Sequence, residues 1–144
     1  MAEPSKTMRQ VLLASVQGLR VTRADLTGAD AIVLDAGVVA TAGLLPNEKV
    51  EVLNGSTGAR FSTSLSVSQK APGAVEICGP AAHFAGVGDQ LAVAAFAWLK
   101  EKAAARHAPR VVKVDERNRV VPAPTGSSEH PVAGPGTSRK ARRA

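Results

Sequence analysis

Short runs of β-branched and aliphatic residues, separated by turn residues, recur along most of this chain. They are VLLASVQGLRV, AIVLD, VEVLN, SLSVS, AVEICG, LAVAAFA and VVKVD, and they follow one another at roughly 10 to 15 residues. This spacing predicts a small, mainly β barrel, because an alternating β–α chain would place a long helical pattern between successive strands. The 144 residues suffice for one domain. Since only 3% of them are aromatic, the core must consist of Val, Leu, Ile and Ala.

Turn and helix signals lie between these runs. Asn54-Gly55 predicts a hairpin after VEVL. Thr22 predicts the cap of a short helical turn that begins near Arg23. Short helices or turns are also expected in VVATAGLLP, which a proline ends, and in GPAAHFAGVGDQ. The one longer helical candidate is the alanine-rich segment WLKEKAAARHA, which the next proline closes.

The composition divides the chain into three parts. Residues 1–7 are expected to be a flexible N-terminus, residues 8–122 to form the domain, and residues 123–144 to be a disordered basic tail rich in Pro, Gly and Ser. The tail holds four basic residues and one acid, so it supplies three of the six net positive charges. We expect a solubilising tail, with weak tethering to RNA or a membrane surface as the alternative. No aromatic residues lie between its charges, so no specific nucleic-acid site is expected.

Several function classes are excluded by what the chain lacks. One cysteine, Cys78, and three scattered histidines, His83, His107 and His130, predict no metal site. There is no phosphate loop, nucleophile elbow or dinucleotide fingerprint. The absence of tyrosine removes any phenolic proton donor. The apolar run near the N-terminus, VLL, is too short for a signal peptide or a membrane span, so a cytoplasmic protein without membrane partners is expected.

Five segments occur in one order at near-constant spacing. They are VTRADL (21–26), AGLL (42–45), GARFST (58–63), CGPAA (78–82) and VGD (87–89). Together they resemble the motifs of the bacterial aspartate 1-decarboxylase family, and the similarity extends over about residues 8 to 122. This resemblance implies a double-psi β-barrel with short helices and one C-terminal helix. It also implies a homotetramer with small-molecule pockets between its subunits.

The residues needed for the family's self-cleavage are replaced. Enzymes of the family cut their own chain at a Gly-Ser bond and convert the serine into a pyruvoyl group, which forms a Schiff base with aspartate. Matching the segments without gaps places that pair on Asp30-Ala31. An acyl shift needs a nucleophilic side chain after the cut, and Ala31 has none. No Ser or Cys lies between residues 16 and 55. We therefore expect no pyruvoyl group and no other cofactor.

The same matching nominates residues for a remaining pocket. Arg60 and Thr63 fit the family's pattern, which implies that Arg60 grips a substrate carboxylate and Thr63 orients groups near the cut. A guanidinium suits that task because it offers a planar fork of donors. A surface charge, a packing residue and a small buried side chain are the competing interpretations of Arg60, Thr63 and Cys78. Asp30 and Asp35 are possible acid or base groups, although capping is the simpler interpretation of such carboxylates. The candidate substrate-binding positions are Gln17, Arg60, Ser64, Cys78 and Gly79.

Three hypotheses of function follow. The favoured one is a family member that has lost pyruvoyl formation. Its intersubunit pocket, widened by Gly28, Ala31 and Ser64, would serve a non-covalent cyclisation, isomerisation or dehydration of a larger biosynthetic intermediate such as a natural product. The second is a genuine aspartate 1-decarboxylase that makes β-alanine for pantothenate. The third is a non-catalytic regulatory or assembly partner of an active paralogue.

Overall fold

The computed structural model describes residues 6–122, and these residues are mainly β. The expected fold class, a double-psi β-barrel with short helices, is confirmed. The expected flexible N-terminus covers residues 1–7, of which residues 1–5 lie outside the described residues, and the expected disordered basic tail over residues 123–144 lies wholly outside them. In chain order the elements are β1 (Met8–Arg20), β2 (Arg23–Asp25), β3 (Ala31–Asp35), α1 (Ala36–Ala42), β4 (Lys49–Asn54), β5 (Arg60–Ser68), β6 (Val75–Cys78), the 3₁₀ helix η1 (Gly79–His83), β7 (Gln90–Lys100), α2 (Glu101–Arg106) and β8 (Arg110–Lys113).

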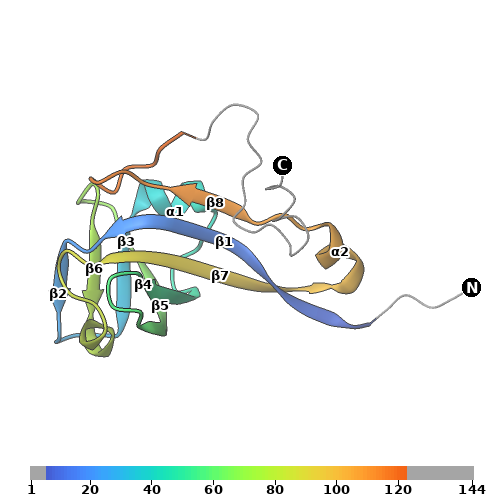
Figure 1. Ribbon diagram of the computed structural model, residues 1–144, viewed down its shortest axis with the longest axis horizontal. Coiled ribbons are helices and arrows are strands. Elements are labelled where there is room, and N and C mark those ends of the chain that lie inside the picture. Colours follow the sequence, from blue (N-terminus) through green and yellow to red (C-terminus); the bar gives the residue numbers. More distant parts are fainter. Residues whose placement is uncertain (1–5, 123–144) are drawn as a thin grey trace, which may run out of the picture.

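The strands form one eight-stranded sheet in the order β2-β6-β3-β5-β4-β7-β1-β8. The long antiparallel strands β1 and β7 run side by side across the molecule, with α2 at one end and β2, β3 and β6 gathered at the other (Figure 1). Three strand pairs are parallel, namely β1–β8, β2–β6 and β3–β5. Parallel neighbours need crossover connections, so strands far apart in the sequence meet in the sheet.

Aliphatic side chains make up the fully buried hydrophobic core of the described domain, and Phe61 packs against it. The largest fully buried side chains include Leu19, Ile32, Leu65, Ile77 and Leu91. Every buried hydrophobic residue in this part of the chain is Ala, Val, Leu or Ile, as the composition predicts. Burying each large aliphatic side chain contributes about 1.5–3 kcal/mol, so many medium-sized residues replace a few aromatic ones.

The hairpin and two of the short helices form where the sequence predicts them. β4 and β5 pair antiparallel on either side of the Asn54-Gly55 turn. Asp35 caps α1 by accepting a hydrogen bond from the Gly37 N–H, and Gly43 ends the helix with φ of 73°. The GPAAH segment forms η1. Among the described residues no helix is long and apolar enough to cross a membrane.

Two local predictions are wrong, and tertiary pairing explains both. Thr22 caps no helix, because Arg23–Asp25 forms strand β2 and the Thr22 hydroxyl bonds both the N–H and the carbonyl of Val75 at 3.1 Å. The C-terminal helix is shorter than expected and covers only Glu101–Arg106. The residues before it, including Trp98, continue β7 and pair with β1. The partner strand therefore overrides the local helical preference.

Asn118 fastens the chain that follows β8 to the barrel. Its side chain is 2% exposed. The amide nitrogen donates to the carbonyls of Arg20 and Gly73 at 2.9 Å each, and the amide oxygen accepts from the Arg20 N–H at 2.8 Å. Two of these hydrogen bonds join the chain after β8 to the end of β1, and the third joins it to the loop before β6.

Replacing Asn118 with glycine should lower the free energy of unfolding by about 2–3 kcal/mol, since it removes these three buried hydrogen bonds. Glycine tolerates the positive φ of 61° at this position, so the loss isolates the side chain. Asn47→Gly is the matched control, because Asn47 also has positive φ but is exposed. In urea unfolding, the free energy of unfolding of the control should lie within about 0.5 kcal/mol of that of the parent protein. Equal losses in both variants would refute the fastening role.

Candidate functional site

Asp30 lies just before β3 and its carboxylate is held at both oxygens. The Thr63 hydroxyl on β5 donates to Oδ2 at 2.8 Å, and the Ala81 N–H of η1 donates to Oδ1 at 2.9 Å. Thr63 is buried at 5% exposure, whereas Asp30 is exposed. The two bonds tie the loop before β3 to two other elements, so this carboxylate is oriented and still open to solvent.

Gly79 allows the same loop to lie close to η1. Its φ is +69°, and a Cβ there would lie 2.8 Å from the Gly28 carbonyl oxygen and 2.9 Å from the Asp30 nitrogen. Beside it, Cys78 pairs with Ala31 across the antiparallel strands β6 and β3. Five positions nominated from the sequence therefore come together, and we call them the Asp30 cluster: Asp30, Ala31, Thr63, Cys78 and Gly79.

The Cys78 thiol is a weak nucleophile in this setting. Burial raises its pKa above the ordinary value, and the carboxylates of Glu76 and Asp25 raise it further, while Arg23 acts in the opposite direction. At neutral pH the group is therefore mostly the protonated thiol. Cys78 serves the cluster as a small half-buried side chain.

Arg60 and Ser64 lie on the other face of β5. Along this strand Phe61, Thr63 and Leu65 are directed toward the core, while Arg60 and Ser64 are exposed. The Arg60 Nε lies 3.6 Å from Oε1 of Glu51 on β4, and the Ser62 hydroxyl donates to the other oxygen of Glu51 at 2.7 Å. Within one chain, Arg60 is thus separated from the Asp30 cluster by the sheet itself.

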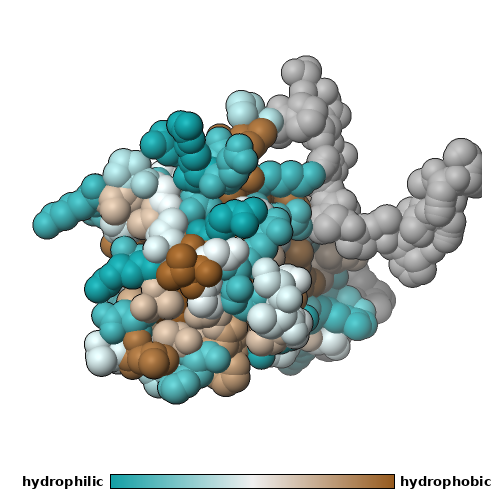
Figure 2. Space-filling view, turned by 60° about the vertical axis from the view of Figure 1, so that its left-hand side comes forward, coloured by the Kyte–Doolittle hydropathy of each residue, from teal (hydrophilic) through white to brown (hydrophobic). Residues whose placement is uncertain are grey.

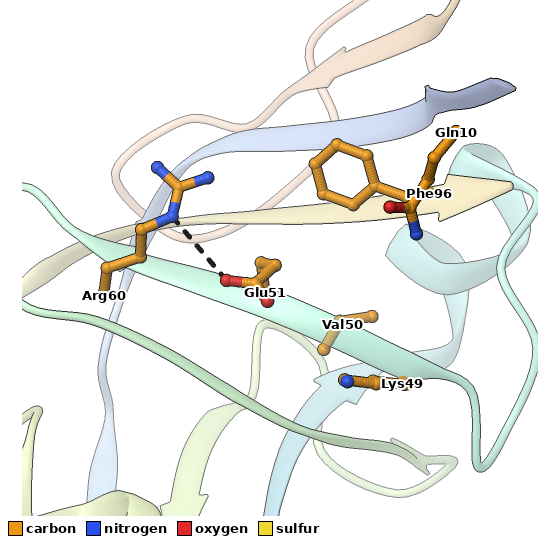
Figure 3. Close-up of a pocket in the computed structure, with 6 residues that line it drawn as sticks. All are labelled: Gln10, Lys49, Val50, Glu51, Arg60 and Phe96. Atoms are coloured by element: carbon orange, nitrogen blue, oxygen red, sulfur yellow. Dashed lines mark ion pairs between the residues drawn. The ribbon is translucent and has the colours of Figure 1, made fainter.

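An open hollow of about 450 Å³ lies on the outer face beside Arg60 (Figure 3). In Figure 3 the Arg60 side chain stands on one side, the ring of Phe96 on the other, and Glu51 between them. Most of its lining side chains are polar or charged, and the three positions expected to widen a pocket, Gly28, Ala31 and Ser64, are not among them. Its lining residues are Gln10, Lys49, Val50, Glu51, Arg60 and Phe96.

Gln17 lies neither in the Asp30 cluster nor among the residues that line the hollow beside Arg60. It lies on β1 opposite Lys113 of β8, where the pairing with β7 is interrupted, and its carbonyl accepts from the Val114 N–H. The next residue, Gly18, lines a second hollow of about 430 Å³ that also includes Arg60. Residues 6–122 contain no group of three His, Cys, Asp or Glu side chains that could hold a metal ion.

The sequence interpretation missed Lys49, Glu51, Gln10 and Phe96. Lys49 and Glu51 could have been predicted, because the Asn54-Gly55 hairpin sets a register in which alternate residues of KVEVL lie on the same face as Arg60. Gln10 and Phe96 come from the pairing of β1 with β7, between strands far apart in the sequence. No local signal indicates that register.

Gly79→Ala should destabilise the protein by about 3 kcal/mol or more, because alanine disfavours positive φ and its Cβ would overlap the backbone of Gly28. Gly86→Ala is the control, since a Cβ there has open space and the residue lacks positive φ. Its unfolding free energy should change by no more than about 0.5 kcal/mol. Chemical denaturation of both variants measures the difference. A stable Gly79→Ala protein would contradict the close packing of this loop.

The similarity to known proteins extends over nearly all of the described domain. The family described as Aspartate decarboxylase matches residues 7–121. A protein of Salinibacter ruber named Aspartate 1-decarboxylase is 43% identical over 110 residues, which cover 76% of this chain and 75% of the relative. A protein of the same name from Chloroherpeton thalassium is 35% identical over 109 residues, covering 76% and 80%. Another from Geobacillus sp. is 34% identical over 112 residues, covering 78% and 88%. The chain therefore belongs to the aspartate decarboxylase family.

Proposed function

We propose that this family member remains a single uncut chain and acts on a small carboxylate-bearing molecule without a pyruvoyl group. The observation that carries the proposal is the Asp30 carboxylate, held by Thr63 and Ala81 directly before Ala31. This is the position at which the family's Gly-Ser pair aligns.

The chemistry of the two residues argues against self-cleavage. The methyl side chain of Ala31 has no oxygen to attack the preceding carbonyl and none to become a keto group. The Thr63 hydroxyl donates its hydrogen to the Asp30 carboxylate and is therefore engaged at that place. The residues present do not fit a pyruvoyl group, so no step of the proposed reaction passes through one.

Arg60 and Asp30 supply what a non-covalent reaction needs. Arg60 is exposed and binds the substrate carboxylate through its guanidinium fork. Asp30 is oriented and open to solvent, so it takes a proton from one substrate atom as a general base. Cyclisation, isomerisation and dehydration all require such a proton transfer. We place this reaction in the cytoplasm, on a biosynthetic intermediate larger than aspartate.

A single site that contains both residues forms between copies of the chain, because Arg60 and Asp30 lie on opposite sides of β5 within one copy. Exposed apolar side chains flank each half. Phe96 lies across the hollow from Arg60, and Leu26 and Phe84 are exposed near the Asp30 loop and η1. Figure 2 turns the β2–β6 end forward and shows apolar patches among hydrophilic residues. Such patches support assembly. We propose a homotetramer.

The second candidate is aspartate 1-decarboxylase activity itself. It is favoured by the printed names of the relatives, which share 34–43% of the aligned residues with this chain. It requires a route to a carbonyl cofactor from a chain that has alanine at the aligned position. The two candidates therefore differ in the covalent state of the protein.

Intact-mass spectrometry of the purified protein, after prolonged incubation at growth temperature, should show one chain near 14.8 kDa. No CO₂ or β-alanine should form from L-aspartate in the same sample. Two fragments, one ending at residue 30 and one beginning at residue 31, would overturn the proposed function, and β-alanine formed from L-aspartate would establish the second candidate.

Native mass spectrometry should give a species of four times the 14.8 kDa chain mass. Phe84→Asp places a charge on an exposed apolar residue near the Asp30 loop and should dissociate this species, because a charge is costly to bury in an interface. Val121→Asp, at an exposed position in the segment that follows β8, is the control and should leave the assembly intact. A parent protein that is monomeric at micromolar concentration would contradict a site built between copies.

A further inference from the structure

We propose that the hollow beside Arg60 binds an elongated ligand with an anionic group at each end, one held by Arg60 and the other by Lys49. The inference deepens the proposed function and rests on it, because it keeps Arg60 as the carboxylate-binding residue. It adds Lys49 as a residue that selects the substrate by length and charge.

Both cations have donors to spare. Within residues 6–122, Lys49 has no ion-pair or hydrogen-bonding partner for its ammonium group, although it lines a concave surface. Arg60 directs Nε toward Glu51 and leaves its two terminal nitrogens without a partner in the same part of the chain. Glu51 is already engaged by Arg60 and by the Ser62 hydroxyl. The hollow therefore presents two positive charges and one carboxylate that is already bound.

The strand register sets the distance between the two cations. Arg60 is opposite Leu53 and Ser64 is opposite Lys49 in the β4–β5 pair. The cations are therefore four residues apart along the sheet, which corresponds to about 14 Å between their backbones. Both side chains are long enough to lean inward. The carboxyl carbons of aspartate are only roughly 4 Å apart, so aspartate is too short to reach both cations.

The walls of the hollow suit the middle of such a ligand. The ring of Phe96 faces the hollow across from Arg60, and Gln10 lies behind it on the neighbouring strand (Figure 3). Ala94, directly opposite Glu51 in the β4–β7 pair, has only a methyl side chain, so no long side chain projects from this position. An apolar ligand body can lie against the Phe96 ring while its charged ends remain near Lys49 and Arg60.

The test is a titration with straight-chain dicarboxylates from succinate to dodecanedioate, each compared with the monocarboxylate of equal length. Backbone amide NMR shifts give the Kd at low ionic strength and also show that each variant is folded. We expect the longer dicarboxylates to bind more tightly than succinate. Lys49→Gln should weaken their binding roughly three- to tenfold, to the level of the monocarboxylates, and leave the monocarboxylates unchanged.

Lys70→Gln is the matched control, because it removes one exposed positive charge outside the hollow and should change neither series. Three results would overturn the inference. They are an unchanged Kd of the long dicarboxylates in Lys49→Gln, an equal Kd for succinate and the longer acids, and no binding of any long dicarboxylate. Arg60→Gln distinguishes a failure of the carboxylate site from a failure of the length selection. If it weakens monocarboxylate binding while Lys49→Gln has no effect, the carboxylate site stands and the length selection fails. If Arg60→Gln has no effect on any acid, the carboxylate site of the proposed function fails.

Discussion

The alternation of side chains along β5 separates the Asp30 cluster from the hollow beside Arg60. Thr63 is directed toward the core and reaches the Asp30 carboxylate, whereas Arg60 is directed outward and meets Glu51. Because a strand has a period of two, positions three residues apart must lie on opposite faces. One chain therefore carries an oriented carboxylate on one side of the sheet and a hollow with two cationic side chains on the other. The proposed assembly would bring these two features of different copies together.

The packing of the barrel near residue 30 and the chemistry of the side chain at residue 30 depend on different residues. Gly79 must remain small because the backbone of residues 28–30 lies against it, and this packing is independent of which side chain residue 30 carries. Asp30 fits the same loop and gains bonds to Thr63 and Ala81. A family scaffold is thus compatible with a changed reaction. The chain contains no tyrosine, so a phenol cannot act as the proton donor in the proposed reaction.

Much of the fold could be predicted from the sequence, because its strands are short aliphatic runs bounded by strong turn signals. The Asn54-Gly55 hairpin and helix α1 follow from local chemistry. Thr22 and Trp98 were misjudged because their conformations depend on distant partners, Val75 for the first and β1 for the second. The resemblance to the family nominated Thr63, Cys78 and Gly79, and the structure brings these three residues close to Asp30 and Ala31. The bond between Thr63 and Asp30 is a long-range contact, and residue spacing alone does not reveal it.

A crystal structure of the assembled full-length protein tests the central claim most directly. The account predicts continuous density through the Asp30–Ala31 peptide, with the Asp30 carboxylate within hydrogen-bonding distance of the Thr63 hydroxyl and the Ala81 N–H. It also predicts that Arg60 of one copy faces the Asp30 loop of the next. A break in the chain between residues 30 and 31, or an Asp30 side chain turned away from Thr63, would contradict it.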